Sequence, residues 1–292
     1  MAAEELGHSP SMLPLFARAG LAMLPGASRL PFVGGGGGGL PDRVLALTDI
    51  QTDRERLTAY DRVCGFTLSD VLPPTYPHML AFPLQLSLMT GGDFPYPAIG
   101  LVHIANRITQ HRAIGAGELI SLRVWAAAAQ SHPSGTQFAL RSEARVGEEL
   151  VWEEESVNLR RGHKDPEANG PSISPPDSSG LPATATWRLA GDLGRRYGAV
   201  SGDLNPIHVH PLSARLFGFP TAIAHGMWTL ARCLAAVDTE LPEAFTVSAA
   251  FKRPILLPAT VTFAETREGN ELRFGVRDAK RDTPHLDGAV SL

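Results

Sequence analysis

Apolar positions occur in the same order in the two halves of the chain. In the second half, residues 222–237 are apolar on almost every side of a helical projection, which predicts a helix buried on every face. Apolar and β-branched runs then predict four strands, at residues 245–251, 260–265, 271–276 and 288–292. The pattern therefore indicates a buried helix followed by a meander of strands.

The first half repeats this order. Residues 78–89 predict an apolar helix, in which Pro83 is best accommodated if it lies in the first turn. Strands are predicted at residues 101–106, 119–127, 136–145 and 150–159. Similar lengths of chain separate His78 from Val102 and His225 from Val247, so the pattern favours one unit that was duplicated.

Two such units predict an α+β fold in which each antiparallel sheet wraps around a central helix. If the edge strands of the units joined into one sheet, an exposed edge would be removed. We expect an N-terminal segment at residues 1–40, partly flexible at the glycine run 34–39, a first unit at 41–161 and a second at 184–292. Residues 162–183, rich in Pro, Gly and Ser, are typical of a linker.

Composition narrows the classes of function. The chain of 292 residues has a net charge of −4, is 43% hydrophobic and carries no basic stripe, which argues against nucleic acid as a partner. The apolar segment 12–24 is too short to span a membrane and lacks the flanks of a signal peptide, so we expect a short helix or docking segment in a cytoplasmic protein. Cys64 and Cys233 follow no zinc-type spacing and are expected to be buried thiols.

One polar stretch, residues 201–208, is unusual for either a core or a plain loop. Asp203 and His208 lie five residues apart, and Gly202 and Pro206 favour turns around them. Such a loop can aim a carboxylate and an imidazole at one water and move its protons. Two alternatives remain open: Asp203 as a turn or helix-capping residue, and a metal site built from His208 and His210 with Asp203 or His225.

A second element supplies what an acid–base pair lacks. Residues 225–227 open the buried helix, and a helix N-terminus presents N–H groups without partners and the positive end of a dipole. Gly226 has no side chain to block an approaching group. A thioester carbonyl placed there would find donors aimed at the oxygen that becomes negative when the proton at C2 is removed.

These motifs together resemble the MaoC-like or hydratase-2 family. The resemblance rests on Ser201-Gly-Asp-Leu-Asn-Pro-Ile-His208, Gly218-Phe-Pro220 and Ala224-His-Gly-Met227, in that order. It implies a double hotdog fold and the activity of a hydro-lyase, either an (R)-specific enoyl-thioester hydratase or a 3-hydroxyacyl-thioester dehydratase of fatty-acid or related acyl metabolism. More loosely, the first half resembles a degenerate hotdog.

The family implies a role for each matching residue. Asp203 and His208 activate the water or return a proton to the leaving hydroxyl, Asn205 orders the loop, and Gly226 donates its N–H to the thioester oxygen. No metal or cofactor is implied, and the partner is an acyl-CoA or acyl-carrier-protein thioester, bound by a monomer or a homodimer. Because the first half lacks the motif, it is expected to be catalytically silent and to leave room for the acyl tail.

Three further residues are expected at the site, and two other functions compete with the hydro-lyase. Ser201 and His225 are expected to support the site, and Arg253 either meets a phosphate of CoA or of a carrier protein, or is a solvated arginine at a strand end. An acyl-thioesterase of the same fold and a non-catalytic acyl-binding subunit of a synthase are the alternatives. The intact motif of the second half favours the hydro-lyase over both.

Overall fold

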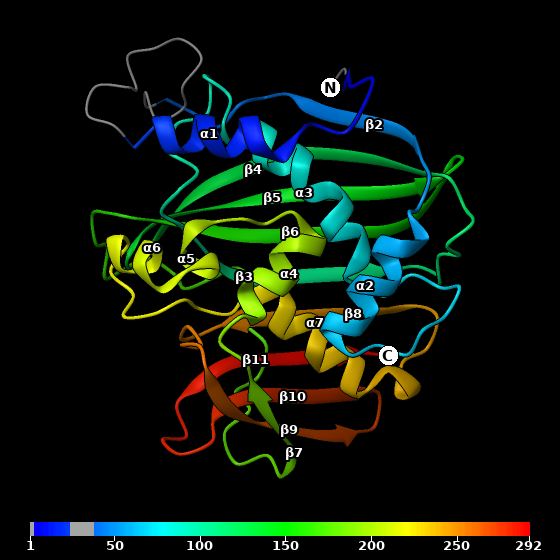
Figure 1. Ribbon diagram of the computed structural model, residues 1–292, viewed down its shortest axis with the longest axis vertical. Helices are drawn as coiled ribbons and strands as arrows, with labels where there is room; N and C mark the ends of the chain where they lie inside the picture. The colour runs from blue at the N-terminus through cyan, green and yellow to red at the C-terminus, as the bar shows by residue number, and fades with distance from the viewer. Residues whose placement is uncertain (1–2, 24–37) are drawn as a thin grey trace.

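The computed structural model describes residues 3–23 and 38–292, in which one 11-stranded sheet carries every strand (Figure 1). The strand order across the sheet is β1-β2-β4-β5-β6-β3-β8-β11-β10-β9-β7. The strands are β1 (Ala3–Glu5), β2 (Val44–Ile50), β3 (Leu101–Gln110), β4 (Ile120–His132), β5 (Gly135–Val146), β6 (Glu149–Arg161), β7 (Ala183–Leu189), β8 (Phe245–Phe251), β9 (Ala259–Glu268), β10 (Glu271–Asp278) and β11 (Pro284–Ser291).

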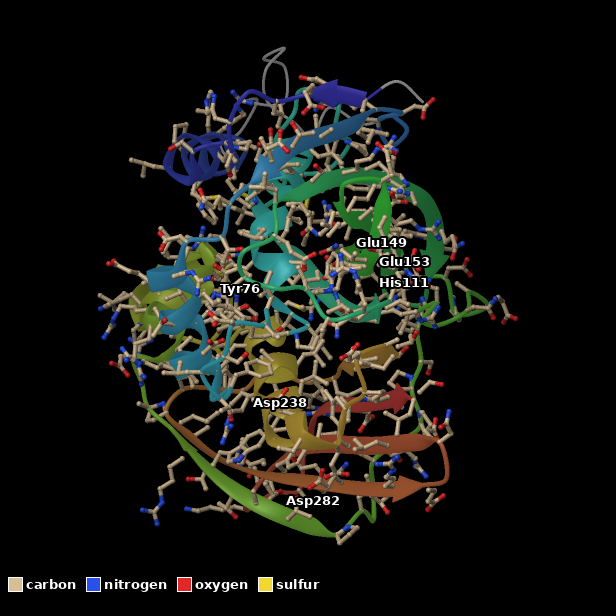
Figure 2. All side chains as sticks on the ribbon, turned by 90° about the vertical axis from the view of Figure 1, so that its right-hand side faces the viewer. Tyr76, His111, Glu149, Glu153, Asp238 and Asp282 are labelled. Carbon is tan, nitrogen blue, oxygen red and sulfur yellow. The ribbon has the colours of Figure 1, made fainter. Side chains whose placement is uncertain are left out.

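The α-helices lie on the inner face of this sheet, which curves around α3 in the first half and α7 in the second (Figure 1 and Figure 2). They are α1 (Met12–Leu21), α2 (Arg54–Cys64), α3 (Tyr76–Met89), α4 (Leu193–Ser201), α5 (Pro206–Val209), α6 (Pro211–Leu216) and α7 (Gly226–Ala236). The α+β fold class and the duplicated order of helix and strands are therefore as predicted.

Strands β3 and β8 join the two halves into one sheet. They pair in antiparallel register from Ala105 with Ala250 to Gln110 with Phe245. Both strands are the first of their meander, so the pairing buries the two edges that each half would otherwise expose. This junction places the inner faces of the two half-sheets, and the helices on them, around one shared interior.

The predicted helix at residues 78–89 contains one error. Helix α3 begins at Tyr76, Pro77 occupies its first turn, and Pro83 lies in the helix interior instead of the first turn. The nitrogen of Pro83 carries no hydrogen to donate to the carbonyl of Met79. The helix nevertheless continues to Met89 because most of its residues, polar ones included, are buried between the sheet and its neighbours.

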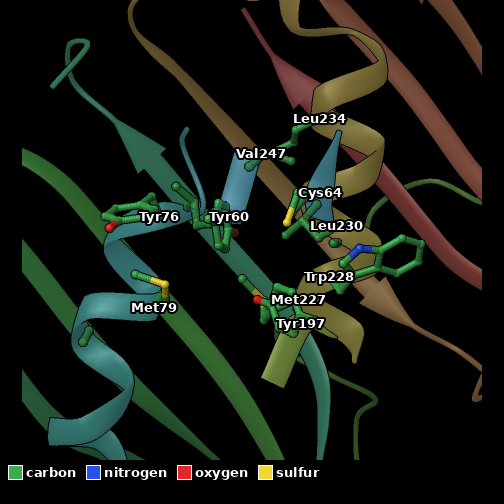
Figure 3. Close-up of a cluster of buried hydrophobic side chains, with 14 of the residues drawn as sticks. Tyr60, Cys64, Tyr76, Met79, Tyr197, Met227, Trp228, Leu230, Leu234 and Val247 are labelled. Carbon is green, nitrogen blue, oxygen red and sulfur yellow. The ribbon is translucent and has the colours of Figure 1, made fainter. Parts of the chain in front are cut away.

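Helix α2, which the hydrophobic pattern did not predict, packs between α3 and α7 (Figure 3). The Tyr60 hydroxyl donates to Thr75 Oγ1 over 2.8 Å, and its ring meets that of Tyr76 edge-on at 5.3 Å. On the other side, Trp228 Nε1 donates to the Val63 carbonyl over 2.9 Å. Through these bonds α2 ties the central helices of both halves together.

The segment expected to be a linker crosses the outer face of the sheet. Ile173 is fully buried there, in an apolar cluster with residues of β3 and β6. Ser178 Oγ donates to Asp287 Oδ1 over 2.5 Å, and Arg273 Nη2 donates to the Asp177 carbonyl over 2.7 Å. These contacts hold the connection between the halves against the sheet.

Other expectations concern the N-terminal region and the thiols. Residues 12–21 of the apolar N-terminal segment form the short helix α1, whereas most of the predicted glycine loop, residues 34–37, lies outside the described residues. Cys64 and Cys233 are both buried and free, as expected. Of the helices that the structure describes, none is long and apolar enough to cross a membrane.

Asp61 on α2 provides a test of this packing. It is 2% exposed, and its Oδ1 has no hydrogen-bond partner among the described residues. Burial, together with the nearby charge of Asp238, raises the pKa of the Asp61 carboxyl from 3.8 to about 6. In the interval between those values the unfolded chain binds fewer protons than the folded one, so the contribution of Asp61 to stability falls as pH rises.

We therefore expect Asp61→Asn to raise the melting temperature relative to the parent protein by a few degrees near pH 7 and by little near pH 4. Melting curves recorded by calorimetry at both pH values measure this difference. Asp70→Asn is the control, because the Asp70 side chain is 84% exposed and pairs only with Arg54 in the described residues. A melting-temperature difference for Asp61→Asn that does not change with pH would contradict the account.

Candidate active site

A cavity of about 490 Å³ lies between the two halves. Its second-half wall is formed by α4, the loop that follows it, the start of α7 and the end of β8. Its first-half wall is formed mainly by α3, β3 and β6. Phe16 and Ala19 of α1 also line it. The cavity therefore collects side chains from segments that are far apart in the sequence.

Helix α4 positions the loop at residues 202–208 through a face made of glycine. A Cβ on Gly194 would overlap the His208 carbonyl, and one on Gly198 would lie 2.8 Å from the Asp203 carbonyl oxygen. Gly202 ends the helix with φ +83°, in the left-handed region that glycine adopts without strain. Only a helix face without side chains lets the loop approach this closely, and sequence reasoning had not identified it.

Short-range hydrogen bonds fix the conformation of the loop. Ser201 Oγ accepts from the Asp203 N–H over 3.2 Å, and Asp203 Oδ1 accepts from the Asn205 N–H over 3.1 Å. Asn205 Oδ1 accepts from the Ile207 N–H over 3.4 Å, so Asn205 caps the short helix α5. Asp203 is thus a turn residue, as the alternative interpretation held, but its side chain also lines the cavity and remains 25% exposed.

His208 is held with one nitrogen turned toward the site. Its Nδ1 lies 2.8 Å from the Ile223 carbonyl oxygen, which can only accept, so Nδ1 carries the proton and Nε2 is left as a bare base. Burial lowers the pKa of His208, while the Asp203 charge and the Ile223 carbonyl act in the opposite direction. The imidazole is therefore neutral at neutral pH and able to take a proton.

His225 stacks directly on His208. Their ring centroids lie 3.7 Å apart at an interplanar angle of 24°, and the Tyr197 ring lies 4.8 Å from that of His225. His225 Nε2 donates to the Asp203 carbonyl over 3.0 Å and lies 3.6 Å from Asp203 Oδ2. Burial, and to a smaller extent the neighbouring His208, lowers the pKa of His225 to about 3. His225 is thus a neutral imidazole that hydrogen-bonds to the loop.

Asp203, His208 and His225 converge on one small volume. One oxygen or nitrogen atom of each lies within 4.8 Å of the other two, a span that one water can bridge or one metal ion could occupy. The alternative metal pair with His210 does not form. His210 is exposed, and its Nδ1 accepts from the Leu212 N–H as the cap of α6.

The N-terminus of α7 faces the same cavity. His225 is its N-cap residue, but no side chain caps the helix, so the N–H groups of the first turn, including that of Gly226, have no partner within the helix. A Cβ on Gly226 would lie 3.1 Å from the Phe251 ring. Glycine therefore leaves the approach to these N–H groups open, between the loop and the end of β8.

Two cationic residues stand where β8 ends. Lys252 and Arg253 both line the cavity and are exposed. Lys252 Nζ lies 3.2 Å from Asp287 Oδ2, whereas Arg253 forms no ion pair with any described residue. Tyr197 and His103 also line the cavity, and sequence reasoning had not assigned either to the site.

Comparison with known proteins shows the family to which the chain belongs. The MaoC like domain profile matches residues 182–289. The chain is 35% identical to 3-hydroxyacyl-thioester dehydratase X of Mycobacterium tuberculosis over 258 residues, which cover 86% of this chain and 90% of the relative. A crystal structure of that relative, HtdX, superposes with a TM-score of 0.76 and covers 86% of this chain and all of its own.

Two more distant structures support the fold alone. A MaoC-like dehydratase from Phytophthora capsici is 18% identical with a TM-score of 0.68, covering 86% of this chain and 95% of its own. A second Mycobacterium tuberculosis protein, described as a double hotdog, is 11% identical with a TM-score of 0.56, covering 83% and 93%. The double hotdog fold predicted from the sequence is thereby confirmed, and the chain belongs to the MaoC-like dehydratase family.

Proposed function

We propose that the chain adds water to 2-enoyl thioesters and, in reverse, dehydrates (R)-3-hydroxyacyl thioesters, with Asp203 and His208 as the catalytic pair. One observation carries the proposal. A carboxylate, a neutral imidazole with a free Nε2 and the open N-terminus of α7 face one cavity between the halves. The relative that is 35% identical over most of the chain is named a 3-hydroxyacyl-thioester dehydratase, which supports this assignment.

The Asp203–His208 pair handles the protons of the water. In the hydration direction, the water lies between the carboxylate and His208 Nε2, and its oxygen forms the bond to C3. The pair takes one proton of this water and delivers it to C2, so the elements of water are added across the double bond. Dehydration runs the same steps backwards, with a proton taken from C2 and one supplied to the departing 3-hydroxyl.

The start of α7 stabilises the charge that forms during this transfer. As water adds to C3, electrons move toward the thioester oxygen, which becomes enolate-like. The Gly226 N–H and the positive end of the helix dipole face that oxygen from the wall of the cavity. A donor of this kind contributes a factor of about 10² to 10³ in related oxyanion sites.

The ends of the substrate extend in two directions. Arg253, exposed beside the cavity and without an ion pair in the described chain, is suited to a phosphate of CoA or of a carrier protein's arm. The acyl tail lies along α3, where Phe82, Leu86 and Met89 line the first-half end of the cavity. The first half thus serves as the wall for the tail and takes no part in the chemistry.

One assay distinguishes this activity from its alternatives. Crotonyl-CoA is mixed with the protein, and both the absorbance of the conjugated enoyl thioester and the release of free thiol are followed. The proposal requires loss of absorbance without thiol release. Thiol release would indicate a thioesterase, and unchanged substrate would indicate a binding protein.

Substitutions in the catalytic pair should separate chemistry from folding. We expect Asp203→Asn and His208→Asn each to lower turnover of crotonyl-CoA by about 10²-fold or more, because each removes a proton acceptor. His210→Asn is the matched control, since His210 lies two residues beyond His208, is exposed and only caps α6. Turnover near the parent value in either catalytic variant would refute the site assignment.

The acid limb of the pH–rate profile should reflect the burial of His208. Because burial lowers its pKa, His208 stays neutral at pH values where an ordinary histidine, with a pKa of about 6.5, would be half protonated. The value of kcat/KM for crotonyl-CoA should therefore decline only below that pH. A limb centred above the ordinary histidine value would show that His208 is not the base, or that it is solvated.

A substitution in the glycine face of α4 should lower the reaction rate more than it disturbs formation of the helix. We expect Gly198→Ala to lower kcat/KM by about tenfold or more, because the added Cβ pushes the Asp203 carbonyl and displaces the loop. Gly191→Ala is the control, since its Cβ would lie 3.8 Å from Pro258, an ordinary contact. Full activity of Gly198→Ala would show that the close approach of loop and helix is dispensable.

A further inference from the structure

A cluster of polar side chains lies inside the first half, where an apolar interior would be expected. Its centre is Glu154 on β6, whose side chain has no exposed surface. His78 Nδ1 lies 2.6 Å from Glu154 Oε1, and Asn106 Nδ2 donates to the same oxygen over 2.7 Å. Gln85 Nε2 donates to Glu154 Oε2 over 3.1 Å. The carboxylate is thus satisfied on both oxygens.

The charge on Glu154 is maintained despite its burial. Burial by itself would raise the pKa of this carboxyl, but the charge and hydrogen bond of His78 and the Asn106 amide outweigh it and hold the pKa below its usual value. A buried carboxylate with its polar partners is seldom the most stable way to fill such a volume, because apolar residues of similar size serve as well or better. A gain in folding stability therefore does not explain why this polar cluster is present.

The two halves differ at this position of the sheet. Beyond Trp152, which belongs to the apolar core, the inward positions of β6 are Glu154, Ser156 and Asn158, three polar residues in alternation. The strand in the same place of the second half is β11, and its inward residues Leu286 and Val290 are fully buried members of the main apolar core. The polar inner face is thus a property of the half that lacks the catalytic motif.

Polar groups of the cluster reach the wall of the cavity. His78, Gln85, Ser156 and Asn158 all line it. The Glu154 carboxylate engages His78 Nδ1, and no hydrogen bond joins His78 Nε2 to the described part of the chain. His103, whose ring stacks 6.4 Å from that of His78, has a buried Nε2 with no partner among the described residues. The wall therefore offers unused hydrogen-bonding capacity.

This wall continues from the thioester site. The Phe251 ring lies against Gly226 at the start of α7, and the His103 ring lies 4.9 Å from Phe251. The next ring along this line is that of His78. An acyl chain whose thioester oxygen meets the Gly226 N–H and which extends along α3 passes these rings in that order.

We propose that the α3 end of the cavity is a subsite for a hydroxyl group on the acyl chain, additional to the 3-hydroxyl of the reaction, and that it is built by His78, Glu154, Ser156 and Asn158. A plain alkyl chain would cover these polar groups and leave them without partners, which costs binding energy. A hydroxyl both donates and accepts, so it satisfies His78 Nε2 in either protonation state and the Ser156 hydroxyl or Asn158 amide beside it.

The subsite rests on the proposed function, because it assumes that the acyl tail of a thioester occupies this cavity. The test therefore measures binding instead of turnover. Saturated octanoyl-CoA and decanoyl-CoA have neither a 2,3-double bond nor a 3-hydroxyl, so they cannot react. Isothermal titration calorimetry measures their dissociation constants and those of a series of hydroxylated analogues. Each analogue carries one hydroxyl, at a different carbon of the distal half of the acyl chain. We expect one position to bind about tenfold more tightly than the plain chain.

Adjacent residues of β6 provide a matched pair of variants. Glu154→Gln removes the charge that holds His78, whereas Glu153→Gln changes a half-exposed residue of the opposite face, where it pairs with His111 at 3.3 Å (Figure 2). We expect Glu154→Gln to abolish the preference for the hydroxylated chain and Glu153→Gln to retain it. Melting curves and the affinity for plain decanoyl-CoA report whether each variant is folded.

Two results would overturn the subsite. One is a hydroxylated chain that binds no better than the plain chain at every position tested. The other is a Glu154→Gln variant that is folded and weakens both ligands equally, since a purely structural cluster would behave in this way. If the hydroxyl preference is found but crotonyl-CoA is not turned over, the subsite stands and only the proposed reaction fails. If crotonyl-CoA is hydrated without any preference, the subsite alone fails.

Discussion

The antiparallel pairing of β3 with β8 is the constraint on which the rest of the structure depends. It turns two helix-wrapping half-sheets into one sheet and sets α3 and α7 around one cavity. Without this junction, the start of α7 would have no wall opposite it, and His103 of β3 would not face Phe251 of β8. The junction therefore creates the interior in which we place both the chemistry and the binding of the acyl tail.

Under the proposed function, the two duplicated halves contribute different parts of that interior. The second half supplies the loop that carries Asp203 and His208, the proposed catalytic pair, and the open N-terminus of α7. The first half lacks the sequence motif of that loop, but its strand β6 carries Glu154, Ser156 and Asn158 on the inner face. A half freed from catalysis can change its inner surface without affecting the reacting atoms, which is how selectivity for the acyl chain can diverge while the reaction is retained.

Sequence patterns anticipated the elements that are strongly apolar and the residues that form a compact motif. The strand expected at 245–251 coincides with β8, and Asp203, His208 and Gly226 do share a cavity. Helix α2 was not predicted, because its buried Leu57, Tyr60 and Cys64 are interspersed with charged residues. The interior position of Pro83 and the role of the α4 glycines depend on what packs against them, which local pattern does not contain. No sequence pattern singles out Glu154 among the neighbouring acids, since only the pairing of β6 decides which of them point inward.

The central claim is that a thioester binds with its carbonyl at the N-terminus of α7 and its C3 beside the Asp203–His208 pair. A crystal structure of the protein with bound decanoyl-CoA tests this placement most directly. We predict the thioester oxygen within hydrogen-bonding distance of the Gly226 N–H, with a water between Asp203 and His208 next to C3 and the acyl chain along α3. A thioester oxygen directed away from α7, or an acyl chain lying outside the cavity, would contradict it.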